Sequence, residues 1–122
     1  MFKGYTSAQL EDLIIINTHL DAEHEINRIQ EATILNNYLL STNDAPLVLG
    51  GDLNTNRKSS SYKTLLRGTN LVEAPQPKPT FLSNKTLDHI TTNLSIKKYW
   101  VNPNIKISDH QPIFLTIKRG NK

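Results

Sequence analysis

The sequence predicts an α/β (α+β) fold in which a mixed β-sheet carries one main helix on one face. Three observations lead to this prediction: an apolar, β-branched run at residues 13–16, an amphipathic segment over residues 22–40, and a second apolar run at residues 46–49. A strand, a helix and a strand over this length are typical of a crossover unit. The 122 residues suffice for one compact domain with a modest core, so we interpret residues 1–122 as a single unit.

The first predicted strand is Leu13–Ile16, whose continuous apolar character indicates burial on both faces. The helix over residues 22–40 follows, with Asp21 as a plausible N-cap. Its apolar side consists of Ile26, Ile29, Ala32, Leu35, Leu39 and Leu40. Its polar side consists of Glu23, Asn27, Gln30, Glu31 and Asn37, with Ile34 as the break in the pattern.

The second strand is Pro46–Leu49, and it ends at Gly50–Gly51. A short helix is predicted over residues 59–67, with Tyr62, Leu65 and Leu66 facing inward. Prolines at positions 75, 77 and 79 indicate a stiff extended loop. The remaining predicted strands are Thr80–Leu82, Leu87–Thr92, Tyr99–Val101 and Ile113–Ile117.

One main helix covers only one face of such a sheet. We expect the other face to carry apolar residues such as Ile14, Ile16, Val48 and Ile113. An apolar face of this kind requires a partner layer, which the sequence does not obviously supply.

The composition restricts the chemistry of any metal site. The chain has no cysteine, so disulfides and thiolate ligands are excluded. Oxygen and imidazole ligands remain, and they favour Mg2+ or Mn2+ over structural zinc. The net charge is +3, with the densest basic positions at Lys97–Lys98 and at Lys118, Arg119 and Lys122. We interpret these cations as a solvated surface in preference to a dedicated nucleic-acid patch.

The sequence contains no stretch that approaches the roughly 20 apolar residues of a membrane span. Residues 1–13 lack the apolar core of a secretory signal. As given, the chain is therefore expected to be cytoplasmic, and secretion of a longer parent protein with its own signal stays compatible with these residues.

Four short polar clusters follow or interrupt the apolar runs. They are His19, the pair Asp52 and Asn54, Asp88, and the pair Asp109 and His110. Polar groups at strand ends can converge on one edge of a sheet. Carboxylates, an amide and imidazoles gathered there are equipped for metal-assisted attack on phosphorus.

The first two clusters have a functional and a structural interpretation. If the backbone stays extended, Asp52 and Asn54 lie on the same side and can orient a water and a phosphoryl oxygen together. The same segment also reads as an Asx-rich turn. His19 can donate to a phosphate oxygen, or it can be a capping or core histidine near a helix start.

The last two clusters are similarly open to two interpretations. Asp88 lies inside an apolar strand, where a carboxylate is costly unless it is paired, and His110 is the candidate partner. Alternatively, Asp88 lies on a solvent face. Asp109 can bind a cation or belong to a polar turn. We interpret His89, on the opposite face from Asp88, as structural, and His24 as an exposed helix residue.

Together and in this order, the clusters resemble the endonuclease/exonuclease/phosphatase superfamily, which has the deoxyribonuclease I-like fold. The motifs are Thr18-His19-Leu20, Gly51-Asp52-Leu53-Asn54, Leu87-Asp88 and Ser108-Asp109-His110-Gln111-Pro112. The Thr80-Phe81 pair and Arg28 also look like the bacterial members. The match spans about residues 13–117.

The resemblance implies a role for each residue. His19 contacts the scissile phosphate, Asp52 orients or deprotonates the attacking water, and Asn54 binds the phosphate or that water. Asp88 orients His110, which stabilises the transition state or acts as acid and base. Asp109 and Asp52 would hold Mg2+ or Mn2+, and the substrate would be a phosphoester, with nucleic acid among the classes the superfamily uses.

The resemblance covers only the C-terminal half of the domain, equivalent to half of a four-layer α/β/β/α sandwich. Nothing before Leu13 matches the strand ending in Asn or the metal-binding Glu with which full members begin. The leading hypothesis is therefore a metal-dependent phosphoester hydrolase that has little activity as this chain alone. The alternatives are a non-catalytic half-domain that assembles with a separate N-terminal half or a second copy, and an unrelated α/β domain with polar turns.

Overall fold

The structure is a computed structural model that describes residues 4–74, 85–102 and 109–118. Its central element is a four-stranded mixed sheet in the order β1-β2-β3-β4. The strands are β1 (Tyr5–Leu10), β2 (Leu13–His19), β3 (Leu47–Asp52) and β4 (Asp88–Thr92). Strands β2 and β3 are parallel, whereas β1 and β4 pair antiparallel with their neighbours. The predicted mixed sheet is thus confirmed.

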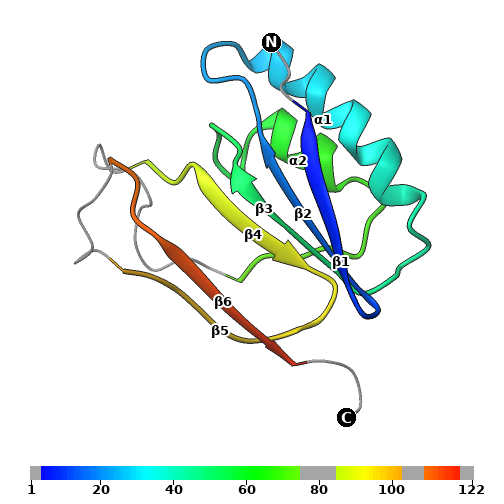
Figure 1. The fold of residues 1–122 in the computed structure, drawn as a ribbon. Coiled ribbons are helices and arrows are strands. Elements are labelled where there is room, and N and C mark those ends of the chain that lie inside the picture. The colour runs from blue at the N-terminus through cyan, green and yellow to red at the C-terminus, as the bar shows by residue number, and fades with distance from the viewer. Residues whose placement is uncertain (1–3, 75–84, 103–108, 119–122) are drawn as a thin grey trace.

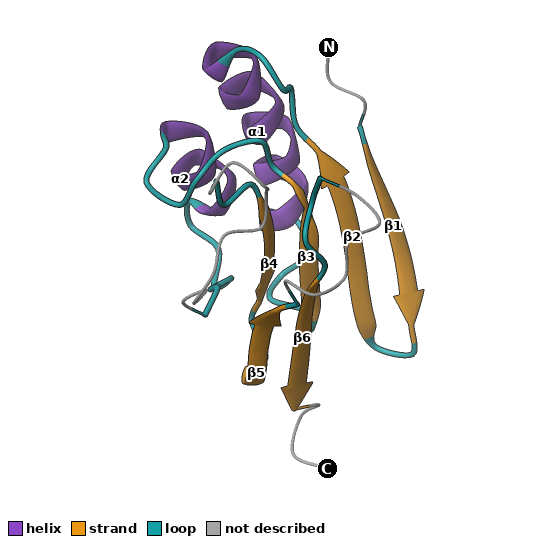
Figure 2. Ribbon diagram, turned by 90° about the vertical axis from the view of Figure 1, so that its left-hand side faces the viewer, coloured by secondary structure: helices purple, strands orange, loops and turns teal. Residues whose placement is uncertain are grey.

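Two helices cover one face of this sheet. They are α1 (Glu25–Leu40), which joins β2 to β3, and α2 (Ser60–Leu66), which follows β3. Figures 1 and 2 show the helices together on one side of the sheet. The core lies between the two layers, and its fully buried members include Ile16, Leu35, Leu49 and Leu65. Strand β2, helix α1 and strand β3 thus form the crossover unit that the sequence predicts.

Two further strands form a separate antiparallel pair, β5 (Ser95–Val101) and β6 (Ile113–Lys118). Figure 1 shows this pair alongside β4, away from the helices. An open groove lies between β6 and the face of the sheet that carries no helix, and its apolar lining includes Ile15, Val48, Ile90 and Ile113. The second face is therefore only partly covered.

Ile14 and Ile16 do not point to the face of the sheet that was predicted for them. Ile16 is buried in the core beneath the helices and Ile14 packs against that core, although Ile16 also borders the open groove that Ile15 lines. The continuous apolar run at the start of β2 does not reveal which alternate residues face which layer. Val48 and Ile113 do line the open side, as expected.

Helix α1 begins later than the sequence indicates, at Glu25 with His24 as the N-cap residue. Asp21 does not cap the helix directly. Its carboxylate accepts hydrogen bonds from the backbone N–H groups of Glu23 and His24, at 3.2 and 2.8 Å, in the turn before it. His24 is exposed, as expected, but it precedes the helix.

The apolar side of α1 is narrower than predicted. Ile26 and Leu40 are 67% and 48% exposed, and Ile34 is exposed as well. Glu31, assigned to the polar side, is instead buried and accepts a hydrogen bond from the backbone N–H of Asp21 at 2.8 Å. Helix α2 matches its prediction, because Tyr62 and Leu65 are buried and Leu66 packs against the core.

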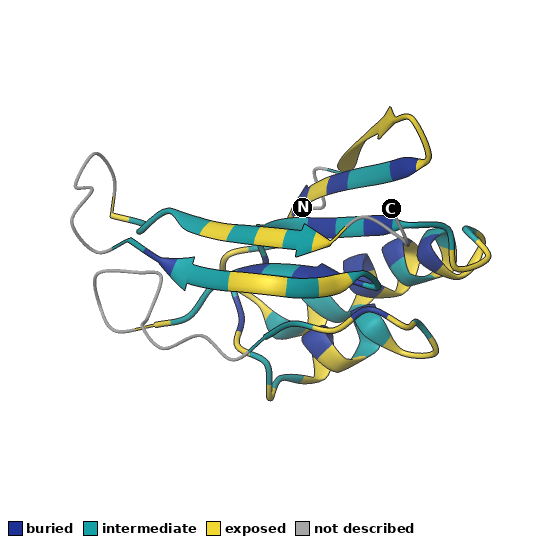
Figure 3. Cartoon of the chain, turned by 90° about the horizontal axis from the view of Figure 1, so that it is seen from below, coloured by how far each residue is buried: buried dark blue, intermediate teal, exposed yellow. Residues whose placement is uncertain are grey.

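Strand β1 was not predicted, and all of its residues are exposed. Figure 3 shows it as an exposed strand at the edge of the sheet. It lacks the alternation that a half-buried strand carries, so only its pairing with β2 defines it. The predicted strand Thr80–Leu82 and the loop of prolines lie outside the described residues. Within the described ranges, no helix is long and apolar enough to cross a membrane.

Candidate active site

The register of the sheet brings three of the predicted residues into one row. His19, at the end of β2, is the lateral partner of Asp52 at the end of β3. Asp52 is in turn the partner of Asp88 at the start of β4. Direct lateral partners point to the same face, so the three side chains share the face that carries no helix. The predicted convergence at one sheet edge is therefore observed.

Gly51 allows this close arrangement. Its φ is +147°, and a Cβ built on it would lie 1.9 Å from the carbonyl oxygen of Thr18. No side chain fits between β2 and β3 at this point. The glycine pair does not stop the strand as predicted, because β3 continues through both glycines to Asp52. Gly51 is instead required to place Asp52 beside His19.

His110 completes the row from the segment that leads into β6. Its Nδ1 lies 2.6 Å from Asp88 Oδ2, and its Nε2 lies 3.5 Å from Asp52 Oδ2. Burial lowers the pKa of His110, but the hydrogen bond to Asp88 and the nearby carboxylates of Asp88, Asp52 and Asp109 outweigh it and raise the pKa above the ordinary histidine value. The imidazolium form is therefore more favoured than in an ordinary histidine, and Nδ1–H is donated to Asp88.

Asp52 occupies the middle of the row. Burial, followed by repulsion from Asp88, raises the pKa of its carboxyl group, while the backbone N–H of Asn54 and the imidazoles of His110 and His19 oppose this rise. Asn54 donates that N–H to Asp52 Oδ1 at 3.0 Å, and His19 Nε2 lies 3.7 Å from Oδ2. His19 is about half exposed, so it remains accessible from solvent.

Asn54 reaches the site in a different way from the prediction. Its φ is +52°, so the backbone is left-handed here and the extended conformation assumed for Asp52 and Asn54 does not hold. Its side-chain Nδ2 instead donates to the carbonyl oxygen of Leu20 at 2.7 Å. This bond ties the loop after β3 to the segment after β2.

The donor set suits a hard divalent cation. Among the described residues, ligand atoms of Asp52, Asp88 and His110 lie within 4.8 Å of one another. Carboxylate oxygens with one imidazole fit Mg2+ or Mn2+, which retain several waters and need few protein ligands. Asp109, predicted as a metal ligand, is 63% exposed, with its Oδ1 4.0 Å from His110 Nε2. It lies at the border of this group.

A buried polar network lies behind the site, and the sequence reasoning missed most of it. Glu73 accepts hydrogen bonds from Tyr62 Oη at 2.9 Å, from Tyr99 Oη and from His89 Nδ1, and it pairs with Arg57 at 3.1 Å. Burial raises the pKa of Glu73, but these partners outweigh it and lower the pKa below the usual value. No sequence signal marks Glu73, because its partners come from distant segments.

His89 connects this network to the site. Its ring is buried, on the opposite face from Asp88 as predicted, and its Nε2 donates to the carbonyl oxygen of Thr55 at 2.7 Å. Thr55 directly follows Asn54, so two hydrogen bonds hold this loop. One joins Thr55 to His89, and the other joins Asn54 to Leu20. His89 is therefore structural.

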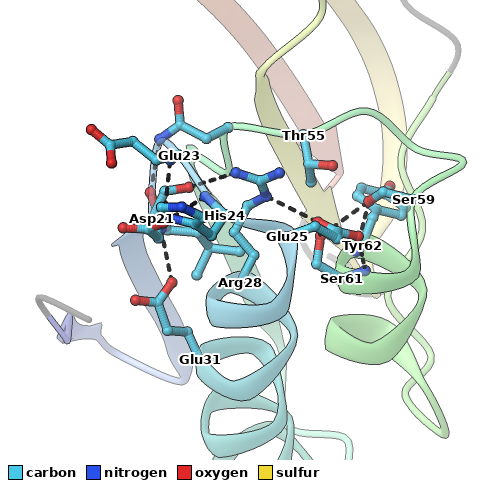
Figure 4. Close-up of polar contacts among 12 residues, drawn as sticks. Asp21, Glu23, His24, Glu25, Arg28, Glu31, Thr55, Ser59, Ser61 and Tyr62 are labelled. Atoms are coloured by element: carbon cyan, nitrogen blue, oxygen red, sulfur yellow. Dashed lines mark hydrogen bonds and ion pairs between the residues drawn. The ribbon is translucent and has the colours of Figure 1, made fainter. Parts of the chain in front are cut away.

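A second polar cluster joins the two helices near the same loop. Glu25 accepts hydrogen bonds from the backbone N–H and the hydroxyl of Ser61, at 3.0 and 2.8 Å, and from Arg28 Nε at 2.9 Å. Figure 4 shows Arg28 between Asp21 and Glu25. This cluster fixes the start of α1 against α2.

Comparisons with known proteins identify the fold. Neither a family model nor a curated protein matches the sequence. An endonuclease/exonuclease/phosphatase from Bacteroides vulgatus matches with 21% identity and a TM-score of 0.74, over 87% of this chain and 50% of that chain. A mannosyl-6-phosphatase from Bacteroides thetaiotaomicron matches with 18% identity and a TM-score of 0.71, over 88% and 51%. The chain has the deoxyribonuclease I-like fold.

A mutant of beta toxin from Staphylococcus aureus, crystallised with bound magnesium ions, has the same fold. It is 19% identical, with a TM-score of 0.64, and the match covers 93% of this chain and 57% of that chain. The chain thus spans about half the length of the solved chains it matches. The predicted resemblance is confirmed at the level of the deoxyribonuclease I-like fold and of its half-domain extent.

Proposed function

We propose that this chain is the C-terminal half of a metal-dependent phosphoester hydrolase, either a nuclease or a phosphodiesterase or phosphatase. The supporting observation is the row of His19, Asp52, Asp88 and His110 at one end of the sheet, in a deoxyribonuclease I-like fold. Acidic and imidazole groups gathered at one exposed end of the sheet suit the transfer of a phosphoryl group to water.

The geometry supports distinct roles for the residues in the row. Asp88 fixes the imidazole of His110 through the 2.6 Å contact, which leaves Nε2 directed toward the Asp52 side. The raised pKa of His110 favours its use as a cationic donor to a phosphoryl oxygen on which negative charge develops. Asp52 orients the attacking water, and His19 and Asn54 contact the phosphate.

Asp52, Asp109 and their neighbours would hold Mg2+ or Mn2+ at this edge. A bound divalent ion supplies charge stabilisation of the phosphoryl oxygens and lowers the pKa of a coordinated water. The protein groups supply the remaining requirement, which is to hold the ester in line with that water.

An activity assay tests this proposal. We expect the 122-residue chain with Mg2+ to show little turnover of a bis-aryl phosphodiester or of nicked plasmid, because the metal-binding Glu of full members has no counterpart before Leu13. A longer protein whose additional N-terminal segment supplies a strand ending in Asn and a metal-binding Glu should be active. Asp52→Ala should lower its rate about 100-fold or more, whereas the exposed Asp44→Ala should not.

Two results would count against the proposal. Robust turnover by the 122-residue chain, abolished by Asp52→Ala, would refute the dependence on an N-terminal half. Equal activity of the longer protein with and without Asp52→Ala would refute the assigned site.

A second candidate function is a non-catalytic module that assembles with a separate N-terminal half or a second copy. The supporting observation is the apolar groove beneath β6, whose lining includes Ile15, Val48, Ile90 and Ile113. An uncovered apolar face is typical of an interaction site. Size-exclusion chromatography with light scattering at several concentrations discriminates here, and a monodisperse, stable monomer would count against assembly with a second copy.

A further inference from the structure

A second hollow lies beside the candidate active site and shares Asn54 with it. It opens between the start of α1, the loop after β3 and the residues that precede β4. Its polar lining comes from Arg28, Asn54, Thr55, Asn56, Lys85 and Thr86. Among the described residues that line it there is no carboxylate. The active-site row, by contrast, contains Asp52 and Asp88.

Arg28 is held in a fixed orientation at this hollow. Its Nη1 donates to the carbonyl oxygen of Asp21 at 2.9 Å, and its Nε donates to Glu25 Oε1 at 2.9 Å. The side chain is only 13% exposed. Figure 4 shows the remaining guanidinium nitrogen on the side where Thr55 lies. In the described part of the chain, Nη2 has no hydrogen-bond acceptor.

The carboxylate of Glu25 does not compete for this nitrogen. Its two oxygens accept hydrogen bonds from Ser61 and from Arg28 Nε. The bond from Nε also holds the guanidinium in place. A planar guanidinium with its orientation fixed loses little entropy when it binds a phosphate. Lys85 adds a second positive charge on an exposed side chain. The amides and hydroxyls of the lining complete a set of donors.

We infer that this Arg28 hollow is a subsite for a second phosphate group of the substrate, next to the phosphoester that reacts. This inference rests on the proposed hydrolase function. One substrate then contacts both places. The reacting ester binds at Asp52 and His110, and a neighbouring phosphate binds at Arg28 and Lys85. The substrate class is therefore a phosphoester that carries at least one further phosphate.

Phosphate binding by the full chain, without metal, tests the subsite. Without a divalent cation the acidic row repels phosphate, so inorganic phosphate should bind at the hollow. In ¹H–¹⁵N spectra at constant ionic strength, we expect saturable shifts at the backbone amides of residues 54–56 and 85–87. Lys85→Gln should weaken binding about three- to fivefold. Lys63→Gln, an equal charge change on α2 away from the hollow, should leave it unchanged.

Arg28→Gln should weaken binding about tenfold or more, because it removes a charged donor. If that variant fails to fold, Lys85→Gln still decides the question. Equal effects of Lys85→Gln and Lys63→Gln, or shifts spread over the surface, would overturn the subsite. Because this titration contains no metal and no hydrolysable ester, its outcome is independent of the activity assay.

Two further probes test the link to the substrate. A 5′-phosphorylated thymidine dinucleotide and inositol 1,4-bisphosphate should each shift the same amides at lower concentration than inorganic phosphate, and the tighter of the two assigns the source of the second phosphate. If neither binds more tightly than inorganic phosphate, the role in substrate binding is overturned.

Discussion

At the scale of single residues, close contacts between charged side chains shift the pKa values of His110 and Asp52. Asp88 lies in a strand, where the sequence already indicates that a carboxylate needs a partner, and the partner is His110 at 2.6 Å. This pairing was predictable because a buried charge is costly when unpaired. The left-handed backbone at Asn54 and its N–H bond to the Asp52 carboxylate agree with the alternative interpretation of this segment as an Asx-rich turn. The side-chain bond from Asn54 to Leu20 was not predictable, because Leu20 belongs to a distant segment.

Asp88→Asn should lower the pKa of His110 toward the ordinary histidine value. The substitution removes the negative charge that holds the imidazolium form, which raises the pKa in the native protein. NMR titration of the imidazole protons measures the change. Asp44→Asn, at an exposed carboxylate away from the site, is the control, and an unchanged His110 pKa in Asp88→Asn would contradict the assigned pair.

Gly51→Ala should destabilise the protein by about 3 kcal/mol or more, because the new methyl group collides with the backbone of β2. Gly50→Ala is a matched control one residue earlier. Its Cβ would meet only ordinary contacts, at 3.5 Å from His89 O, and should cost less than about 1 kcal/mol. Urea denaturation followed by circular dichroism compares the two, and equal free energies of unfolding would refute the steric argument.

At the scale of elements, the sequence predicts the type of each core element better than its limits. Helix α1 and strands β2 and β3 follow from strong periodic or continuous apolar patterns. The apolar residues at the two ends of α1, Ile26 and Leu40, extend beyond the layer they were expected to cover. Glu31 is buried through its bond to the backbone of Asp21, which no periodicity reveals.

Leu35→Ala in α1 should destabilise the protein by about 3 kcal/mol, because the side chain is fully buried between the helix and the sheet. The neighbouring Ile34 is 55% exposed. Ile34→Ala should therefore change the free energy of unfolding by less than about 0.5 kcal/mol. Thermal or urea unfolding of both variants measures the difference, and similar losses would show that α1 packs in another rotation.

At the scale of the whole molecule, the convergence of the site was predictable because strand ends meet at a sheet edge. The residues His19, Asp52 and Asp88 come together through register alone. The separate pairing of β5 with β6 was not predictable, since Ser95–Val101 lacks a clear alternation. Strand β1 also escaped prediction, because an exposed edge strand carries no apolar pattern.

Amide hydrogen exchange should follow the position of each strand in the sheet. In the isolated chain, we expect the amides of β3, which has a partner on both sides, to be protected far more than those of the exposed edge strand β1. Exchange followed by NMR measures both strands in one sample. Equal protection of β1 and β3 would indicate that another chain covers the edge.

The contact between Asp88 and His110 has one more consequence. Asp88 and Asp52 belong to the four-stranded sheet and His110 to the segment entering β6. The contacts of His110 with Asp88 at 2.6 Å and with Asp52 at 3.5 Å therefore join the two layers at one end of the groove. A chain segment or ligand that fills the groove from its other end would act on the spacing of the two layers that His110 joins. We therefore expect occupancy of the groove to affect the orientation of the His110 imidazole. Under the proposed hydrolase function, an N-terminal half that occupies the groove would help to set the angle at which His110 meets the substrate.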